Sequence, residues 1–142
     1  YLDGSGWSGS IPAELGNLTN LTMLDLHGNY GLSGSIPTEL GNLVNLKELY
    51  LAETGISGSI PAELGNLTSL TDLYLNDNKL TGDITTVMSA LRTNGVIETV
   101  NLAGNGCLSV SDPGLATWLS EVRYGWDDGC PYFVGPPDTT AG

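Results

Sequence analysis

Positive charge is scarce in this chain of 142 residues. Four Lys and Arg stand against 16 Asp and Glu, so the formal net charge is −12 at pH 7. A nucleic-acid partner requires a basic surface that meets the phosphates, and this composition excludes that class of partner. Long apolar runs are absent as well, and none approaches the ~20 residues that span a bilayer. We therefore expect neither nucleic-acid binding nor membrane insertion.

Histidine and cysteine are also rare, because the chain has one His and two Cys. A Ser-His-Asp or Cys-His arrangement would have to use His27, but no serine shares its predicted strand and both cysteines lie far along the chain. We expect no catalytic residue, no cofactor and no enzymatic activity. The sequence shows neither an initiator Met nor a signal peptide, which favours a mature product or a fragment.

A short repeat, with a period of about two dozen positions, runs through the chain from Tyr1 to Asn105. Isoleucine marks the same position in every copy, at Ile11, Ile36, Ile60 and Ile84. The first interval is one position longer than the next two, which are equal, because Tyr30 with Gly31 lengthens a loop. A unit this short cannot bury a core by itself, so the copies must stack on one another as a solenoid.

Leucines set this period. In three copies they are Leu18, Leu21, Leu24 and Leu26, then Leu43, Leu46, Leu49 and Leu51, then Leu67, Leu70, Leu73 and Leu75. An Asn or its substitute follows, at Asn29, Thr54, Asn78 and Asn105. The arrangement resembles the leucine-rich repeat family, in its plant-type subclass with the pattern LxxLxxLxLxxNxLxGxIPxxLGxLxxL. The resemblance covers residues 1–107.

Each position of the pattern has a structural meaning. The LxL element has the period of a strand with one buried face, and parallel copies should form a parallel sheet with strands ~4.8 Å apart. The Ile-Pro pair keeps the chain extended before a short helical turn. We predict an α/β solenoid: a leucine-rich repeat arc with a concave parallel β-sheet, a convex side of 3₁₀ or short helices, and a helical C-terminal cap.

Two local features connect the copies. The repeated Asn can donate to and accept from the backbone of neighbouring turns, so we expect a ladder of Asn side chains. Thr54 offers only a hydroxyl there and should be the weak member. Gly34, Gly58 and Gly82 occupy a turn that needs positive φ or close packing.

The fourth copy departs from the pattern. The step from Asn78 to Asn105 is longer than either of the steps between earlier ladder residues. Apolar residues at helical spacing, Val87, Met88 and Leu91, predict a true short helix there. Asn94 and Gly95 should end it.

A second helix is expected after the repeats. Ser111 or Asp112 can cap it, with Pro113 in its first turn. Its apolar face carries Leu115, Trp118, Leu119 and Val122. We expect it to cover the open end of the last repeat, and the stretch resembles the C-terminal caps of bacterial secreted proteins with plant-type repeats.

The two cysteines bracket this closing segment. Cys107 takes the position that Leu80 holds one copy earlier, and Cys130 follows the predicted helix. A disulfide between them would contribute ~3 kcal/mol in the chain-entropy model, and two buried free thiols are the alternative. We divide the chain into residues 1–106, leucine-rich repeats of about four turns plus a partial first strand; 107–130, a disulfide-closed cap; and 131–142, a Pro/Gly/Thr linker or tail.

The first copy begins inside a strand and shows no cap. Trp7 takes the apolar position of the turn, where we expect a core side chain. The first turn would then leave apolar surface and a sheet edge unprotected. Either further repeats precede Tyr1 or this edge self-associates.

The exposed strand positions form columns. One is Asp25, Tyr50, Tyr74 and Asn101; Met23, Glu48 and Asp72 lie beside it, and His27 and Asn76 follow. We assign these residues to ligand binding, because aromatic and hydrogen-bonding side chains in a rigid acidic array suit recognition. The alternative is ordinary strand residues, with tyrosine favoured by its β propensity.

Chemistry on this face is not expected. Glu48 and Asp72 lie on adjacent strands, as a retaining glycosidase pair would, but an open sheet neither excludes water nor raises one pKa. With Asp25 these carboxylates could attract Ca²⁺. The pattern lacks the convergent geometry of a loop site, so we assign no metal.

Hydroxyl groups form two further rows, at Ser8, Ser33, Ser57 and Thr81 and at Ser10, Ser35 and Ser59. Such an array could order water or bind ice, although Ser-Gly belongs to the plant-type pattern. Asn17, Asn20 and Asn66 each begin an Asn-Leu-Thr sequon and are candidates for N-glycosylation.

These features predict a non-catalytic recognition module, extracellular or at the cell surface, that binds a protein, peptide or glycan on its acidic concave face. The alternative is a structural repeat subunit of a surface assembly or larger adhesin that associates through the N-terminal edge. A water-ordering surface is the minor alternative. The resemblance implies this class alone, because plant-type repeats serve receptors, inhibitors and adhesins alike.

Overall fold

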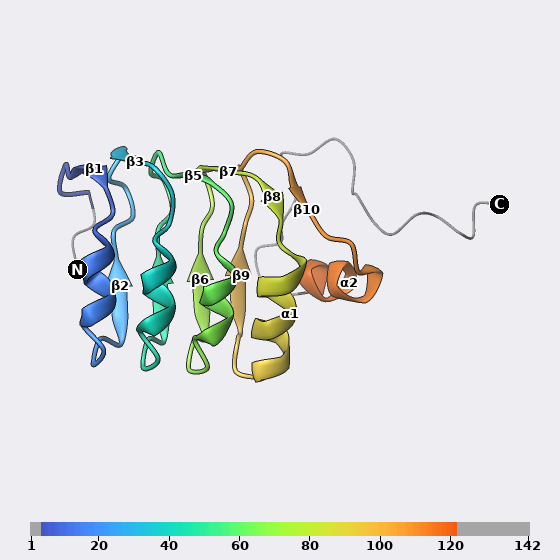
Figure 1. Ribbon diagram of the computed structural model, residues 1–142. Coiled ribbons are helices and arrows are strands. Elements are labelled where there is room, and N and C mark those ends of the chain that lie inside the picture. Colours follow the sequence, from blue (N-terminus) through green and yellow to red (C-terminus); the bar gives the residue numbers. More distant parts are fainter. Residues whose placement is uncertain (1–3, 122–142) are drawn as a thin grey trace.

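The structure is a computed structural model that describes residues 4–121. Its repeats stand side by side in one row from the N-terminal to the C-terminal end (Figure 1). In each repeat an inner strand and a short helix lie on opposite sides, and lateral segments connect them along one edge. This is the solenoid that the period predicts.

Two kinds of strand build the row, and they pair in parallel. The inner strands β2 (Met23–Asp25), β4 (Glu48–Tyr50), β6 (Asp72–Tyr74) and β9 (Thr99–Asn101) form one four-stranded sheet. Lateral strands pair in twos: β1 (Ser8–Ser10) with β3 (Gly31–Ser33), β5 (Ser57–Gly58) with β7 (Lys79–Leu80), and β8 (Gly82–Asp83) with β10 (Leu108–Ser109). The predicted parallel sheet is confirmed, and its solvent side is called the concave face below.

Helices cover the other side of the sheet (Figure 1). Three are 3₁₀ helices, η1 (Ala13–Asn17), η2 (Thr38–Asn42) and η3 (Ala62–Asn66). Neighbouring 3₁₀ helices meet through their backbones, because a Cβ atom on Gly41 would lie 2.5 Å from the carbonyl oxygen of Glu63. None of the helices within residues 4–121 has the length and apolar character that crossing a bilayer requires.

Repeat four carries the predicted α-helix. Helix α1 (Thr85–Asn94) buries Val87, Met88 and Leu91. Gly95 ends it in the left-handed conformation, with φ 77° and its N–H on the Arg92 carbonyl. Because α1 is longer than a 3₁₀ turn, it accounts for the longer fourth step.

Helix α2 (Pro113–Glu121) closes the described part of the solenoid. The Asp112 carboxylate caps it by accepting from the N–H groups of Gly114 and Leu115, at 2.9 and 3.3 Å. Leu115 and Leu119 are buried, and the Arg92 guanidinium lies 5.9 Å from the centre of the Trp118 ring. The predicted cap helix is confirmed, while Val122 lies outside the described residues.

Leucine columns fill the space between sheet and helices. All eight pattern leucines of repeats two and three are 0% exposed: Leu43, Leu46, Leu49, Leu51, Leu67, Leu70, Leu73 and Leu75. Burying each such side chain contributes about 1.5–3 kcal/mol. Stacking of the repeats therefore stabilises the fold more than any single turn does.

Repeat one is less covered. Trp7 holds the position of Leu32 and Ile56, which are 2% and 0% exposed, yet it is 45% exposed. Leu18 is 51% exposed for the same reason. No earlier turn within the described residues packs on these side chains, so the prediction that Trp7 is a core residue is wrong.

The predicted ladder of Asn side chains connects the repeats. Asn78 donates to the carbonyls of Leu51 and Leu75, at 2.8 and 3.0 Å, and so joins repeats two and three. Thr54 bonds forward, from its Oγ1 to Asn78 Oδ1 at 2.7 Å, but makes no such bond back to Leu26. Its hydroxyl is the weak member that we predicted, because it has one hydrogen to donate where Asn has two.

The lateral turns show the expected backbone. Gly34, Gly58 and Gly82 have φ of 77°, 79° and 98°. This conformation favours glycine because it places no Cβ against the following carbonyl. The turn prediction is confirmed.

Cys107 does not lie where we expected. Its side chain is exposed, and Leu108, 3% exposed, is buried in this turn. The cause is the strand register, because Leu108 pairs with Gly82 across β10 and β8. Cys107 is disulfide-bonded, but Cys130 and residues 131–142 lie outside the described residues, and the Cys107–Cys130 pairing stays a prediction.

Candidate functional site

The concave face has the register that the repeat predicts. Asp25, Tyr50, Tyr74 and Asn101 lie opposite one another across four strands, and Met23, Glu48, Asp72 and Thr99 form the neighbouring column. His27 and Asn76 follow β2 and β6 at the same edge of the sheet. All nine assigned residues therefore lie on one side of the sheet or at its edge.

Tyr50 and Tyr74 form the centre of this surface. Their rings stack with centroids 5.0 Å apart and an interplanar angle of 23°. The Tyr50 hydroxyl donates to Glu48 Oε1 at 2.8 Å. Burial of this hydroxyl, and then the bond to Glu48, raise its pKa far above the usual value. The pair is thus a preorganised aromatic platform with a carboxylate at its edge.

Asp25 is buried rather than exposed, at 5% of its surface. Its Oδ1 accepts from the His27 N–H at 3.1 Å, and Nδ1 of His27 lies 2.6 Å away. A carboxylate accepts only, so Nδ1 carries the proton. A buried charge needs such partners, and Asp25 therefore orders the end of β2 instead of presenting a free carboxylate.

Asn101, at the other end of the column, also accepts a hydrogen bond from the backbone just after its strand. Its Oδ1 accepts from the Ala103 N–H at 3.2 Å, two residues on, as Asp25 does from His27. Asn76 donates from Nδ2 to Asp77 Oδ2 at 2.7 Å, and its Oδ1 is buried without a hydrogen-bond partner among the described residues. The outer members of the columns thus support the strand ends.

The carboxylates on this face do not gather into one cluster. Asp72 and Glu48 are half-buried neighbours on adjacent strands, and Asp72 Oδ2 accepts from the Thr71 hydroxyl at 2.8 Å. Across residues 4–121, no three His, Cys, Asp or Glu side chains gather as metal ligands. Asp25 is hydrogen-bonded to His27.

A further feature lies at the rim of this face, where the chain leaves the strands. Tyr30 is 73% exposed, and its hydroxyl donates to Glu53 Oε2 at 3.1 Å. Glu53 and Asp77 have φ of 56° and 59°, and these are the only positive values outside glycine among residues 4–121. The repeat pattern did not predict this cluster. Gly28 at the same position of repeat one was the signal, because glycine there suggests positive φ.

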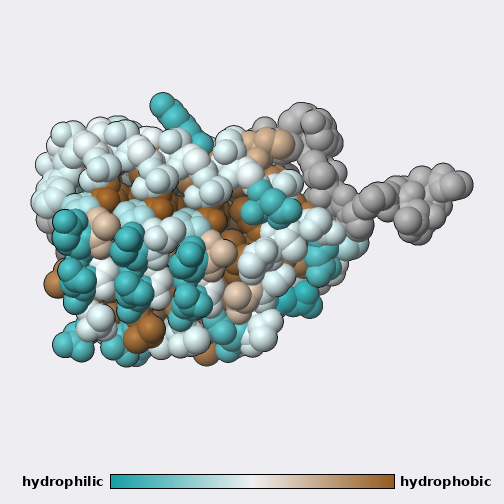
Figure 2. Space-filling view, viewed as in Figure 1, coloured by the Kyte–Doolittle hydropathy of each residue, from teal (hydrophilic) through white to brown (hydrophobic). Residues whose placement is uncertain are grey.

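Hydroxyl rows lie along the lateral turns. Ser10, Ser35 and Ser59 are exposed, and each lies beside the turn glycine of the next repeat. A groove of about 440 Å³ separates Ser35 and Ser59 from η3 and α1, with Ile36 and Ile60 among its lining residues. Figure 2 shows this hollow as a row of apolar atoms between two polar margins.

The three sequon residues are accessible. Asn17 and Asn66 end η1 and η3, Asn20 follows in the next turn, and all three are exposed. Asn42 holds the equivalent position in repeat two but is followed by Leu43 and Val44, so it lacks the hydroxyl that a sequon requires. The geometry permits a glycan at each of the three positions.

Comparison with known proteins identifies the repeats. A model of two leucine-rich repeats matches residues 44–87, and a single-repeat model matches residues 20–43. The BIR2 ectodomain of Arabidopsis thaliana is 34% identical over 99% of this chain and 69% of its own, with a TM-score of 0.76. No curated protein matches the sequence.

Two other solved structures bear on function. The LRR ectodomain of the Arabidopsis receptor kinase HAESA, in complex with an N-terminally extended IDA peptide hormone ligand, is 40% identical over 82% of this chain and 19% of its own, with a TM-score of 0.70. A plant ice-binding protein is 34% identical over 76% of this chain and 34% of its own, with a TM-score of 0.68. The chain spans only 22% of the plant peptide hormone receptor RGFR1.

The matches agree with the fold. Parallel inner strands, the Asn ladder, 3₁₀ helices after Ile-Pro, and the sequence identity to the BIR2 ectodomain along nearly the whole chain all point to one class. The chain belongs to the leucine-rich repeat family, with repeats of the plant-type pattern.

Proposed function

We propose that the chain is a non-catalytic recognition module, extracellular or at the cell surface, that binds a protein, peptide or glycan on its concave face. The stacked pair of Tyr50 and Tyr74 carries this proposal. A rigid aromatic platform loses little conformational entropy on binding, and tyrosine is enriched at binding hot spots. A peptide is the favoured ligand, since HAESA shares the fold and is bound to a peptide hormone.

The charge of the face supports a specific type of partner. Glu48 and Asp72 flank the two rings, and the chain as a whole carries −12. Electrostatic complementarity raises association rates and suppresses wrong partners. A cationic segment therefore fits this surface better than an acidic one.

Panning a random peptide display library against the folded chain tests the proposal. We expect enriched peptides whose binding falls by tenfold or more in the Tyr50→Ala, Tyr74→Ala double variant, the scale of a hot-spot residue. Ser35→Ala with Ser59→Ala is the control on another surface and should leave the affinity unchanged. Equal binding to both double variants would place the ligand elsewhere and contradict the proposal.

An extracellular location has its own support. Cys107 is disulfide-bonded, disulfides persist in oxidising compartments, and the BIR2 and HAESA matches are ectodomains. We propose that Cys107 pairs with Cys130 and that Asn17, Asn20 and Asn66 accept glycans in a host that glycosylates. Glycosidase treatment should shift the mass of wild type, and Thr19→Val and Thr68→Val should each remove one glycan.

An ice- or water-ordering surface is a second candidate. Exposed Ser10, Ser35 and Ser59 form a regular row, and a plant ice-binding protein shares the fold. Thermal hysteresis tests it directly. Thermal hysteresis in wild type that is lost in Ser35→Tyr would support this function. Freezing behaviour like that of an inert protein would contradict it.

End-to-end packing is the remaining alternative. Trp7 and Leu18 are 45% and 51% exposed at the repeat-one end, and such a patch suits contact with another chain. Light scattering over a range of concentrations tests self-association. A mass that stays monomeric contradicts it, and a dimer that Trp7→Ser dissociates supports it.

A further inference from the structure

Tyr30 has an aromatic side chain that is exposed to solvent and restrained by a hydrogen bond. The insertion that lengthens the first interval places it in the loop after β2, where it is 73% exposed. Its hydroxyl is fixed by Glu53 Oε2 at 3.1 Å. No other aromatic ring within the described residues stacks on it. The ring therefore keeps its faces open while its position is restrained.

Glu53 retains binding capacity in this arrangement. One carboxylate oxygen accepts from Tyr30, and the other has no hydrogen-bond partner among the described residues. Asp77 follows Asn76, whose carbonyl accepts from the Glu53 N–H at 2.9 Å. The bond to Glu53 raises the pKa of the Tyr30 hydroxyl, and the charge of Asp77 adds a smaller effect in the same direction. The ring thus stands beside two negative charges.

The fold does not require acids at these positions. Gly28 and Gly104 hold the same place in repeats one and four, with φ of 76° and 72°. A residue with a Cβ is disfavoured in this conformation, yet Glu53 and Asp77 adopt it at 56° and 59°. Aspartate is tolerated in this region, whereas glutamate is not, so backbone geometry alone does not explain Glu53.

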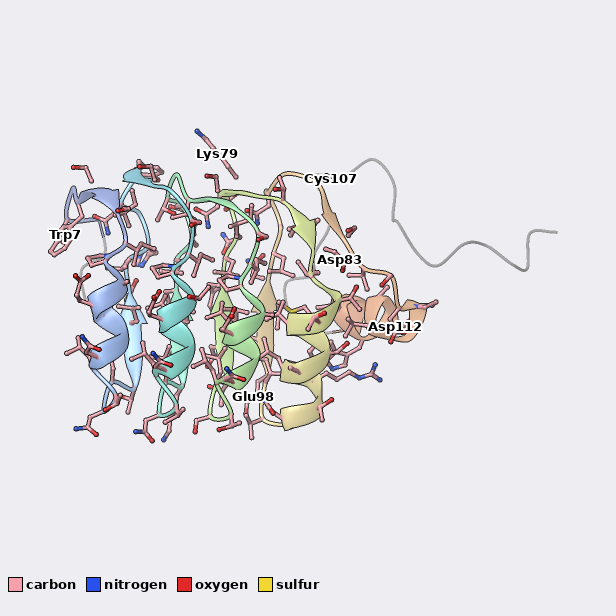
Figure 3. The ribbon with its side chains drawn as sticks, in the orientation of Figure 1. Trp7, Lys79, Asp83, Glu98, Cys107 and Asp112 are labelled. Carbon is pink, nitrogen blue, oxygen red and sulfur yellow. The ribbon has the colours of Figure 1, made fainter. Side chains whose placement is uncertain are left out.

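Positive charge nearby is limited. Lys47 is exposed and directly precedes β4, and Lys79 projects outward from the lateral turns, away from the body of the solenoid (Figure 3). Neither lysine forms an ion pair with Glu53 or Asp77, for none is present between these described residues. Within the described residues, no lysine neutralises the carboxylates of Glu53 and Asp77, so both can attract a positively charged partner.

We propose that Tyr30 and Glu53, aided by the charge of Asp77, form a rim site for an arginine side chain of the partner. This rests on the proposed function, because the rest of the partner lies on the concave face. A guanidinium group is planar, so it can stack on the Tyr30 ring while its N–H groups bond the free oxygen of Glu53. Lysine presents a compact point charge and cannot do both.

The test uses peptides selected on the wild-type chain by display. We expect an arginine at a fixed position, and its replacement by lysine should weaken calorimetric binding about fivefold. Tyr30→Ala should weaken binding about threefold, within the range of one exposed cation–π contact. Glu53→Gly should weaken it about tenfold through loss of a charge-assisted bond.

Folding is separated from binding by the choice of variants. Glycine is the residue best suited to the backbone of Glu53, so Glu53→Gly should unfold at the same or higher denaturant concentration while it loses affinity. Thr38→Ala, on the opposite side, is the matched control and should change neither quantity. A Glu53→Gly variant that binds as tightly as wild type overturns the rim site.

The two proposals fail in different ways. If selected peptides lose affinity in the Tyr50→Ala, Tyr74→Ala variant but show no arginine preference and bind Tyr30→Ala normally, the concave face stands and the rim site is wrong. If no peptide is enriched, or the tyrosine pair has no effect, the proposed function itself is wrong. Arginine preference together with loss on Glu53→Gly supports both.

Discussion

Tyr50 and Tyr74, one repeat apart in sequence, stack with ring centroids 5.0 Å apart. The contact arises because β4 and β6 pair in parallel with these two residues directly opposite. Residues at the same position of successive repeats therefore lie next to one another and form a continuous surface. The same relation that stabilises the sheet preorganises the proposed binding face.

This stack should be measurable as a coupling energy. Tyr50→Ala and Tyr74→Ala together should destabilise the fold by about 1 kcal/mol less than the sum of the single changes, as for other aromatic pairs. Urea denaturation of the four proteins in the cycle measures it. A control cycle with Tyr30→Ala and Tyr74→Ala should be additive within about 0.5 kcal/mol. Additivity in both cycles would mean that the rings do not interact.

The weak ladder position should be improvable. Thr54→Asn restores the second donor, so its amide can bond the Leu26 carbonyl as Asn78 bonds Leu51 at 2.8 Å. A gain of about 1 kcal/mol in the free energy of unfolding is expected, the usual size of one hydrogen bond. The reverse change, Asn78→Thr, should cost at least as much, because it removes the bond to Leu51. A stable Asn78→Thr protein would show that the ladder contributes little.

Acidic residues in the left-handed conformation should limit stability. Glu53→Gly should raise the free energy of unfolding by about 0.5–1 kcal/mol, because it relieves the Cβ at φ 56°. Ala52→Gly is the matched control next door, where φ is not positive, and it should lower stability. Thermal unfolding followed by circular dichroism compares them. Destabilisation by both changes would mean that the Glu53 side chain supports the fold.

Alkaline pH should expose the environment of Tyr50. Its raised pKa means that the folded state holds the phenolic proton more tightly than the unfolded chain, whose tyrosines titrate near 10. This stabilisation is complete below pH 10 and is lost as the pH rises above that value toward the raised pKa. The free energy of unfolding of wild type should therefore fall more than that of Tyr50→Phe as the pH rises above about 10. Parallel curves would show that the pKa is not raised.

Much of the fold could be predicted from the sequence because stacking ties each residue to its equivalents. Once Ile36, Ile60 and Ile84 are seen at equal intervals, the buried leucines and the columns of β2, β4, β6 and β9 follow. The same logic predicted the Asn ladder and the weakness at Thr54. Because equivalent positions of successive repeats are neighbours in a solenoid, the repeat itself predicts contacts between residues far apart in the sequence.

The errors arose where a residue lacks an equivalent neighbour. Trp7 has the sequence position of a core residue, but no earlier described turn covers it. Asp25 stands in an exposed column, yet His27 two residues on draws its carboxylate inward at 2.6 Å. Cys107 does not take the position of Leu80, because Leu108 pairs with Gly82 in β10 and β8 where Leu80 pairs with Gly58 in β7 and β5.

The rim site was hidden for a related reason. Tyr30 is an insertion, and Glu53 approaches it from the next repeat. A periodic pattern predicts what recurs, and this contact occurs once. Reading Gly28 and Gly104 as marks of positive φ would have drawn attention to Glu53 and Asp77.

Chemical-shift mapping with a display-selected peptide tests the central claim most directly. We predict that the largest amide shifts on titration fall on β4 and β6, around Glu48, Tyr50, Asp72 and Tyr74, and extend to Tyr30. Shifts confined to the Ser10, Ser35 and Ser59 row, or to the Trp7 end of the solenoid, would contradict recognition by the concave face.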